Sequence, residues 1–354
     1  HLACGTWRRH RGGSVPERTA AILGVGLIGG SVAAGLGRVG WRVVGYDANP
    51  AVADRARELR LIDVAVDSID ETIDGADLVV VAAPPSATIR MVAGLATDAV
   101  VMDVAGVKQV VVDAAGHLPR FVATHPMAGR ETSGPDAASA ALFHGATWVV
   151  VEGADDEATR MVVEVISSLG ARPVTMTATA HDRAVALVSH LPQLVASGLL
   201  ASAADDPASL TLAAGSFRDL TRVGASEPLA WVEILKANDD AVLHAITALR
   251  DRLSVLEAAI LSDDDALAQH LAASRATRAM LGSPVAQVRV ALADKPGELA
   301  KAGHAFEASG VDIRDIQMRH APHGGGGVLT LAVRPGEEGT LRLALEAEGL
   351  LVMP

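Results

Sequence analysis

Residues 19–31 read TAAILGVGLIGGS, an apolar run that breaks at a glycine-rich turn and continues into an Ala-rich stretch. Gly24, Gly26 and Gly29 have the G-x-G-x-x-G spacing. In such a segment the first glycine permits a tight turn, the second lets the backbone approach a pyrophosphate, and the third allows a helix to pack closely on a strand. The helix start supplies N–H groups to the anion. The segment therefore predicts a strand, turn and helix that bind a dinucleotide.

An acidic residue closes the next predicted strand, Arg42–Tyr46. Asp47 stands about 20 residues after the glycine turn, where a carboxylate accepts a hydrogen bond from a ribose 2′-OH. Because a carboxylate repels a 2′-phosphate, Asp47 favours NAD over NADP, although Arg55 and Arg57 in the following helix keep NADP open. A glycine-rich turn without a cofactor is the alternative. The residues expected to bind NAD are Gly24, Gly26, Leu27, Ile28, Gly29, Asp47 and Pro84.

The residue pattern divides the chain into three regions after an expected disordered arm at residues 1–18. Residues 19–177 alternate short apolar runs with helical stretches, which is typical of an α/β fold with a Rossmann-type doubly wound sheet. Residues 178–282 show helical patterns with almost no strand signal, and such an all-α region often buries its spare face in a homodimer. Residues 286–354 read strand, helix, strand, strand, helix, strand, a small βαββαβ domain. The strands expected in the first region are Ala20–Gly24, Arg42–Tyr46, Leu78–Ala82, Val100–Asp103, Phe121–Thr124, Thr147–Glu152 and Pro173–Met176.

The composition argues against several classes of protein. A net charge of −12 disfavours a nucleic-acid partner, because phosphate binding needs clustered Lys and Arg. The single cysteine, Cys4, cannot form an intrachain disulfide or a cysteine metal cluster, so we expect a reducing cytoplasm and no metal site. The most apolar long stretch, Val185–Ala203, is interrupted by polar residues, and no apolar run follows the N-terminal arginines. We therefore expect neither a membrane span nor a signal peptide.

Five blocks resemble, in order and spacing, the signature of the prephenate dehydrogenase family. They are Gly24–Ser31 (GVGLIGGS), Asp103–Lys108 (DVAGVK), His125–Gly134 (HPMAGRETSG), Ser189–Gln193 (SHLPQ) and Phe217–Trp231 (FRDLTRVGASEPLAW). The resemblance extends from Thr19 to about Leu281, and the C-terminal unit resembles an ACT domain. It implies oxidative decarboxylation of prephenate to 4-hydroxyphenylpyruvate, with hydride transfer to NAD, on the way to tyrosine. Such a reaction needs a base for the ring hydroxyl, cations for two carboxylates and a nicotinamide held in register.

His125 is the expected catalytic base. It follows the strand Phe121–Thr124 at the carboxyl edge of the sheet, where ligands of open α/β folds bind. Imidazole has a suitable intrinsic pKa for general base catalysis. The resemblance implies contact between His125 and the substrate hydroxyl, whereas a lone histidine before a proline is otherwise a structural residue.

Arg222 is the residue expected to bind a substrate carboxylate or to gate its entry. The resemblance implies this role for the arginine nine residues before Trp231, and a guanidinium suits bidentate binding of a carboxylate. The alternative is a surface arginine paired with an acid such as Asp219 or Glu131. Both interpretations of Arg222 are compatible if an ion pair between Glu131 and Arg222 opens as substrate enters.

Ser189, His190 and Gln193 are expected on one helix, with Ser189 and Gln193 sharing the face that the resemblance places towards substrate and nicotinamide. His190 is either on this side or structural. Gln193 favours prephenate over arogenate, because a neutral amide does not pair with an amine. Arg130, where some relatives have threonine, would add a cation near the substrate or point to solvent. Gly106 stands where some relatives have a serine that bonds the catalytic histidine, so a water, a backbone group or another side chain must orient His125.

The ACT-like unit predicts regulation. Its turn Asp294–Leu299, with Asp294, Pro296 and Gly297, would bind the carboxylate of tyrosine or phenylalanine at a helix start. The alternative is a domain that only stabilises the oligomer. For the whole chain, the alternatives are an arogenate dehydrogenase that uses NAD or NADP, and a non-catalytic sensor of NAD and amino acids. A general hydroxyacid dehydrogenase would need a catalytic lysine within His181–Ala203, and none is present.

Overall fold

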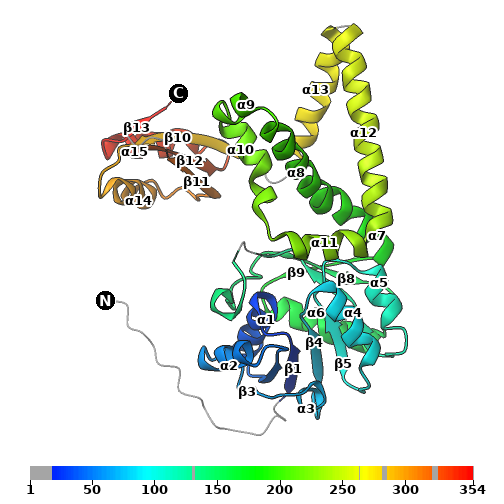
Figure 1. Ribbon diagram of the computed structural model, residues 1–354. Helices are drawn as coiled ribbons and strands as arrows, with labels where there is room; N and C mark the ends of the chain where they lie inside the picture. The colour runs from blue at the N-terminus through cyan, green and yellow to red at the C-terminus, as the bar shows by residue number, and fades with distance from the viewer. Residues whose placement is uncertain (1–17, 130–131, 263, 281–284, 321–325, 354) are drawn as a thin grey trace. The chain divides into compact units, whose positions relative to one another are not determined.

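The computed structural model describes residues 18–129, 132–262, 264–280, 285–320 and 326–353. The arm expected at residues 1–18 therefore lies, apart from Arg18, outside the described residues. The chain divides into two compact units, residues 1–251 and 252–354. Figure 1 labels helices and strands along the chain, coloured by residue number. The division lies inside helix α12 (Asp239–Ser262), upstream of the boundary that we expected between residues 282 and 286.

The first unit contains the expected Rossmann-type sheet. Its six strands are all parallel and lie in the order β3-β2-β1-β4-β5-β6. Strands β2 and β3 are added on one side of β1 and strands β4 to β6 on the other, so the strand order reverses between β1 and β4. The strands are β1 (Thr19–Leu23), β2 (Arg42–Tyr46), β3 (Val64–Ala65), β4 (Leu78–Val81), β5 (Val100–Asp103) and β6 (Phe121–Val122). Ligands of doubly wound folds bind at the carboxyl ends of the strands beside this reversal.

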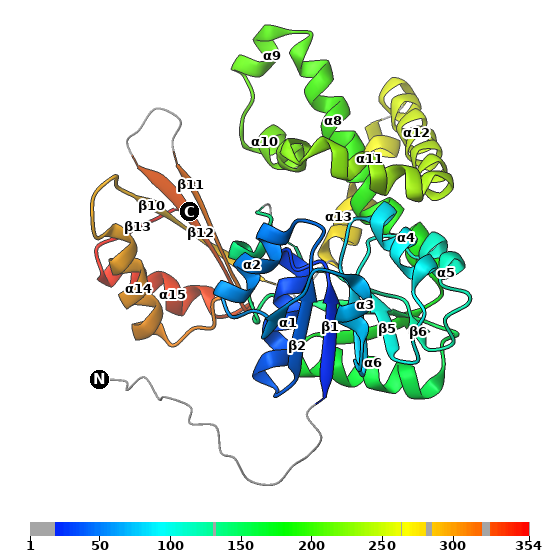
Figure 2. The same ribbon diagram turned by 60° about the horizontal axis from the view of Figure 1, so that its bottom comes forward.

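Helices cover both faces of this sheet, as the turned view in Figure 2 shows. One face packs on α1 (Leu27–Arg38), α2 (Pro50–Glu58) and α6 (Asp156–Ser168). The other face packs on α3 (Ile69–Ile73), α4 (Pro85–Gly94) and α5 (Gln109–Ala114). Because both faces are covered, the central strands are nearly continuous apolar runs instead of alternating, and β1 and β4 are wholly buried. The short elements β3, α3 and α5 were not predicted from the sequence.

A second, three-stranded sheet follows, which corrects the expectation of one continuous strand at Phe121–Thr124. That segment divides at Ala123: β6 ends the main sheet, and β7 (Thr124–Pro126) pairs antiparallel with β8 (Thr147–Val151). The strand β9 (Arg172–Met176) then pairs parallel with β8. The division places His125 on a strand of its own beyond the edge of the main sheet.

The described residues from Ala178 to Ala279 form helices and turns, as the sequence predicts. The elements are α7 (Ala178–Val185), a π-helical turn (Ala186–His190), α8 (Leu191–Ala204), α9 (Pro207–Thr211), α10 (Gly215–Thr221), the 3₁₀ turn η3 (Arg222–Ala225), α11 (Pro228–Ala237), α12 and α13 (Asp264–Ala279). The run Ala178–Ala204 is long and apolar enough to cross a membrane, but a core helix can meet the same criterion, so this is weak evidence of a span. Large apolar side chains on it, including Leu187 and Val188, are exposed.

The C-terminal sheet confirms the βαββαβ order. It has the strand order β11-β12-β10-β13 with antiparallel pairing throughout. Its elements are β10 (Ala286–Leu292), α14 (Glu298–Ser309), β11 (Asp315–His320), β12 (Gly327–Val333), α15 (Glu338–Ala347) and β13 (Leu351–Val352). The hairpin expected around Pro322–Gly327 is confirmed by the pairing of β11 with β12, although residues 321–325 lie outside the described residues.

Alanine at Gly35 is expected to give a free energy of unfolding about 1–3 kcal/mol lower than alanine at Gly37 in the same helix. A Cβ at Gly35 would lie 2.2 Å from Leu169 Cδ2, and Leu169 is itself buried. No atom lies within 4 Å of a Cβ at Gly37, where alanine should stabilise the helix. Urea unfolding of both variants, followed by circular dichroism, measures the difference. Equal stabilities would contradict this packing of α1.

Candidate active site

The glycine-rich turn lies between the end of β1 and the start of α1. Gly24 has a φ of +96°, and a Cβ there would lie 2.3 Å from the Ala82 carbonyl oxygen. A Cβ at Gly29 would lie 1.9 Å from the Gly24 carbonyl oxygen. Around Gly26, by contrast, no atom lies within 4 Å of the Cβ position. The first and third glycines are thus required by close packing, while the second leaves open space beside the helix N-terminus, and this geometry fits a pyrophosphate.

Asp47 lies beside this turn at the end of β2. Its carboxylate accepts hydrogen bonds from the backbone N–H groups of Val25 (3.1 Å) and Asn49 (3.0 Å), which fixes it against the glycine segment. Arg55 and Arg57, the two arginines that left NADP as a possible cofactor, both form ion pairs with exposed acids. Arg55 Nη2 lies 2.6 Å from Asp136, and Arg57 Nη2 lies 3.0 Å from Asp54.

The other expected cofactor residues lie at the same edge of the sheet. Leu27 and Ile28 open α1, and Pro84 is the N-cap residue of α4, just after β4. Ala82, two residues before Pro84, donates its N–H to the Leu23 carbonyl at the end of β1 (2.7 Å). The cradle therefore gathers at the reversal between β1 and β4.

A buried ion pair fixes the backbone that carries His125. Lys108 and Asp103 are both fully buried, and the Lys108 ammonium is paired with the Asp103 carboxylate. Lys108 Nζ also donates to the Thr124 carbonyl (2.7 Å), and Asp103 accepts from the Thr124 N–H (3.0 Å). Trp148 Nε1 donates to the Thr124 hydroxyl (2.9 Å). Thr124 is thus held on three sides, directly before the histidine.

His125 contacts two residues that we did not predict from the sequence. Its Nδ1 lies 2.8 Å from His181 Nε2, and His181 Nδ1 lies 2.8 Å from the Asp182 carboxylate. Asp182 in turn accepts the backbone N–H groups of Lys108 and Gln109, each at 2.8 Å. His181 and Asp182 are adjacent in α7, and His181 is 56 residues from His125, so only the His-Asp pair at the start of the helical region could have signalled them.

The surroundings keep His125 in its neutral form. Burial lowers its pKa well below the ordinary value of 6.5, and the electrostatic interactions with Lys108, His181 and His190 lower it further. Gly106 faces the other edge of the ring: a Cβ there would lie 3.6 Å from His125 Nε2. The side chain that orients His125 is therefore His181, which answers the question raised by glycine at position 106.

The helical residues expected at the substrate differ in their exposure. His190 is buried, lies 3.3 Å from Asn238 Nδ2 and meets the Trp231 ring edge-on at 6.2 Å between centroids. Gln193 is 6% exposed, and its carboxamide oxygen has no hydrogen-bond partner among the described residues. Ser189 is exposed. The three residues lie on one continuous helical run, Ala178–Ala204, as expected, but a π-helical turn that ends at His190 widens the spacing before α8 begins.

Arg222 opens η3 and is exposed. Gly224 brings η3 against α8, since a Cβ there would lie 2.6 Å from Leu200 Cδ1 and 3.7 Å from Ala196. Arg222 thus lies on η3, which packs against Ala196, and Ala196 is within one helical turn of Gln193 in α8. Arg130 and Glu131, the other two expected residues, lie outside the described residues.

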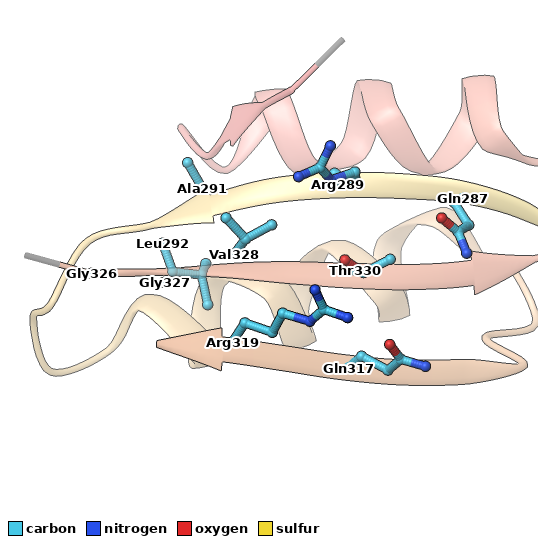
Figure 3. A pocket seen from close by; sticks show the side chains of 10 residues that line it. All are labelled: Gln287, Arg289, Ala291, Leu292, Gln317, Arg319, Gly326, Gly327, Val328 and Thr330. Atoms are coloured by element: carbon cyan, nitrogen blue, oxygen red, sulfur yellow. The ribbon is translucent and has the colours of Figure 1, made fainter. Parts of the chain in front are cut away.

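Two cavities lie in the C-terminal sheet domain. One of about 270 Å³ is lined by the expected residues Asp294, Pro296 and Gly297 at the start of α14. The larger, about 620 Å³, lies over the sheet face that presents Arg289, Arg319 and polar neighbours (Figure 3). Neither contains the groups gathered around His125. Among the described residues, no three His, Cys, Asp or Glu side chains form a metal-binding group.

Comparison with known proteins places this constellation in a family. The sequence profile of the prephenate dehydrogenase nucleotide-binding domain matches residues 32–175, and that of the prephenate dehydrogenase dimerization domain matches residues 177–273. The chain belongs to the prephenate dehydrogenase family. The resemblance drawn from the five sequence blocks is thereby confirmed, and the second profile coincides with the region expected to be helical.

Two relatives and one solved structure illustrate the similarity. The cyclohexadienyl dehydrogenase of Zymomonas mobilis is 35% identical over 278 residues, covering 74% of this chain and 95% of that protein. The prephenate dehydrogenase of Bacillus subtilis is 34% identical over 242 residues, 64% of this chain and 65% of that protein. The crystal structure of prephenate dehydrogenase from A. aeolicus, in complex with hydroxyphenyl propionate and NAD+, superposes with a TM-score of 0.70. It is 29% identical and covers 76% of this chain and 100% of that one.

Replacing Lys108 by methionine is expected to lower the free energy of unfolding by about 3–5 kcal/mol, because the buried Asp103 carboxylate loses its counter-charge. The control is Arg57→Met in the same compact unit. Its ion pair with Asp54 is exposed on both sides, so the expected change is below about 1 kcal/mol. Chemical denaturation measures both. Similar losses in the two variants would show that the buried pair does not secure the Thr124 backbone.

Proposed function

We propose that this chain catalyses the NAD-dependent oxidative decarboxylation of prephenate to 4-hydroxyphenylpyruvate, a step in tyrosine biosynthesis. The observation that carries the proposal is His125, a half-buried imidazole held through Nδ1 by His181, at the carboxyl edge of a dinucleotide-binding sheet. Family membership and the nature of the ligands in the A. aeolicus complex support the same reaction.

The reaction balances without a net proton. Hydride leaves the ring carbon that bears the hydroxyl, and the ring carboxylate leaves as CO₂ with its electron pair retained in the ring, which becomes aromatic. NAD, when bound at the glycine turn, supplies the acceptor of the hydride. His125 takes the hydroxyl proton as the C–O bond gains carbonyl character, and returns it to the same oxygen once the ring is aromatic.

NAD is the cofactor that the cradle fits best. Asp47 presents a carboxylate at the position of a ribose diol, and Arg55 and Arg57 are engaged with acids rather than directed to a 2′-phosphate. The open space at Gly26 accommodates the pyrophosphate.

The substrate carboxylates are assigned to Arg222 and its neighbours. A guanidinium on η3, packed against α8, is suited to bidentate binding. The unpartnered Gln193 oxygen calls for a hydrogen-bond donor from a bound ligand or water, and a neutral amide there is compatible with the keto acid side chain of prephenate. We assign the gating role to Glu131 and Arg222, and a supporting cation to Arg130. We also assign Ser189 and His190 to the side of the helix that faces the substrate.

We propose a homodimer formed through the helical region. The dimerization-domain profile covers it, and Leu187, Val188 and Leu199 are exposed on the apolar run that also meets the criterion for a membrane span. A partner subunit covering these side chains would account for their exposure in a single chain.

Turnover decides the function. Formation of NADH at fixed enzyme concentration is expected with prephenate and NAD. Formation of NADH with arogenate, or of NADPH with NADP, is expected to be much slower. The variant His125→Asn is expected to lower kcat by about 10²–10⁴-fold, because the base is lost. Faster turnover with arogenate would transfer the assignment to that substrate. Absence of turnover on every combination, with NAD binding intact, would leave the sensor alternative.

The pH profile follows from the environment of His125. Since burial and the electrostatic interactions with Lys108, His181 and His190 lower its pKa, the neutral, base-competent form persists as the pH falls. The acid limb of kcat/KM is therefore expected well below pH 6.5, the ordinary histidine value. Measurement of kcat/KM for prephenate across pH tests this, and an acid limb above 6.5 would contradict a buried neutral base.

The C-terminal domain is proposed to regulate the enzyme by binding tyrosine or phenylalanine at the cavity of about 270 Å³ beside α14. Millimolar tyrosine or phenylalanine is expected to change the KM or kcat for prephenate. Gly297 has a φ of +93° at this helix start, so Gly297→Val should abolish the response without changing the basal rate. Gly339→Val, at an open position of α15, is the control that keeps it. Unchanged wild-type kinetics with both amino acids would reject the proposal.

A further inference from the structure

We propose that His181 and Asp182 act as positioning residues for the base: they fix His125 in the tautomer with its proton on Nδ1 and its lone pair on Nε2. The inference deepens the proposed function and rests on it for the identity of the proton donor, the substrate hydroxyl. The geometric part stands by itself on the two 2.8 Å contacts that join the three side chains.

The assignment follows from counting donors along the chain of contacts. A carboxylate only accepts, so His181 Nδ1 must carry the hydrogen directed at Asp182. A neutral imidazole has one N–H, so His181 Nε2 is an acceptor. His125 Nδ1, 2.8 Å away, must then be the donor, and this leaves His125 Nε2 unprotonated. A doubly protonated His181 would reverse this order and leave Nε2 as a donor, unable to act as a base.

Asp182 is held too firmly to turn away. Its two oxygens accept the backbone N–H groups of Lys108 and Gln109, and the side chain is only 7% exposed. Lys108 is also the residue that holds the Thr124 carbonyl. One hydrogen-bond network therefore fixes both the backbone before His125 and the Asp182 carboxylate. Asp182 ends the series of contacts from His125 through His181, which we call the relay.

Glycine at position 106 makes the relay necessary in this chain. A Cβ there would lie 3.6 Å from both Cε1 and Nε2 of His125, so a serine hydroxyl at that position would come within reach of Nε2. With glycine, the Nε2 edge carries no side-chain contact from this position. Orientation of the ring then depends on the Nδ1 side, where His181 stands.

The same relay stabilises the charge that develops during the reaction. When Nε2 takes the hydroxyl proton, the imidazolium donates through Nδ1 to His181, which Asp182 polarises in turn. The proton on Nε2 is then positioned to return to the product oxygen. No proton needs to pass through His181.

Two substitutions of His181 separate the hydrogen bond from the packing. His181→Gln retains an acceptor near the Nε2 position, whereas His181→Leu removes it at similar volume. We expect kcat to fall by about 10²–10³-fold in the leucine variant, with KM for prephenate and NAD within about threefold, and the glutamine variant to recover at least about tenfold of the loss. His117→Leu, outside the site, is the control with unchanged kcat. Equal kcat in wild type and His181→Leu, or no recovery with glutamine, would overturn the proposal.

Asp182→Asn tests the end of the relay. An amide N–H directed at His181 Nδ1 would reverse both tautomers and protonate His125 Nε2, as an Asp→Asn change does in the serine protease triad. We expect a loss in kcat as large as that of His181→Leu. If circular dichroism shows that His181→Leu does not fold, His181→Gln and Asp182→Asn still test the proposal. Only Asp182→Asn should protonate His125 Nε2 and so remove its basic lone pair.

The tautomer itself can be read without substrate. In enzyme labelled with ¹⁵N-histidine, long-range ¹H–¹⁵N spectra distinguish protonated from unprotonated ring nitrogens, and the His125 signal is the one lost in His125→Asn. We expect protonated Nδ1 and unprotonated Nε2 in the wild type, and protonated Nε2 in Asp182→Asn. Protonated Nε2 in the wild type would overturn the relay. Correct tautomers without turnover of prephenate would instead overturn the proposed substrate, so the two failures are distinct.

Discussion

The arrangement of the site depends on one buried ion pair, Lys108 with Asp103. Removing two charges from water is costly, and such a pair is tolerated only where further hydrogen bonds satisfy both partners. Here Asp103 also accepts the N–H groups of Ala105 and Thr124, and Lys108 also donates to the Thr124 carbonyl. The pair therefore ties the end of β5 to the strand that leaves the main sheet.

The consequence of this tie is the position of His125. Because Thr124 is bound to the end of β5 while its neighbours pair with β8, the chain changes sheets at Ala123. His125 then stands beyond the main sheet, opposite the helical region that supplies His181 and Asp182. The backbone N–H of Lys108 binds Asp182, so the residue that secures the strand also orients the carboxylate behind the base. Lys108 therefore links the fold to the proposed chemistry, the former through its side chain and the latter through its backbone N–H.

Local patterns account for what the sequence predicted well. The glycine turn, the parallel strands, the helical region and the βαββαβ unit depend on short-range signals such as glycine spacing and apolar runs. The break at Ala123 has no such signal, since Phe121–Thr124 is apolar enough to be one strand. The contact of His125 with His181 joins residues 56 positions apart, and periodicity carries no information on such pairs. The π-helical turn Ala186–His190 was missed because the surrounding pattern is that of an ordinary helix.

The proton balance of the proposed reaction explains why the base is linked inward, to His181 and Asp182. If the hydroxyl proton had to reach solvent, His125 would need an open path of exchangeable groups. Because the proton returns to the oxygen it left, the base needs only a fixed lone pair and a partner that shares its transient charge. A neutral histidine behind it, anchored by a carboxylate that is itself bonded to two backbone N–H groups, meets that need without adding a net charge beside the substrate. The positive charge of Lys108 opposes protonation of His125, so the ion pair that secures the strand also helps to keep the base neutral.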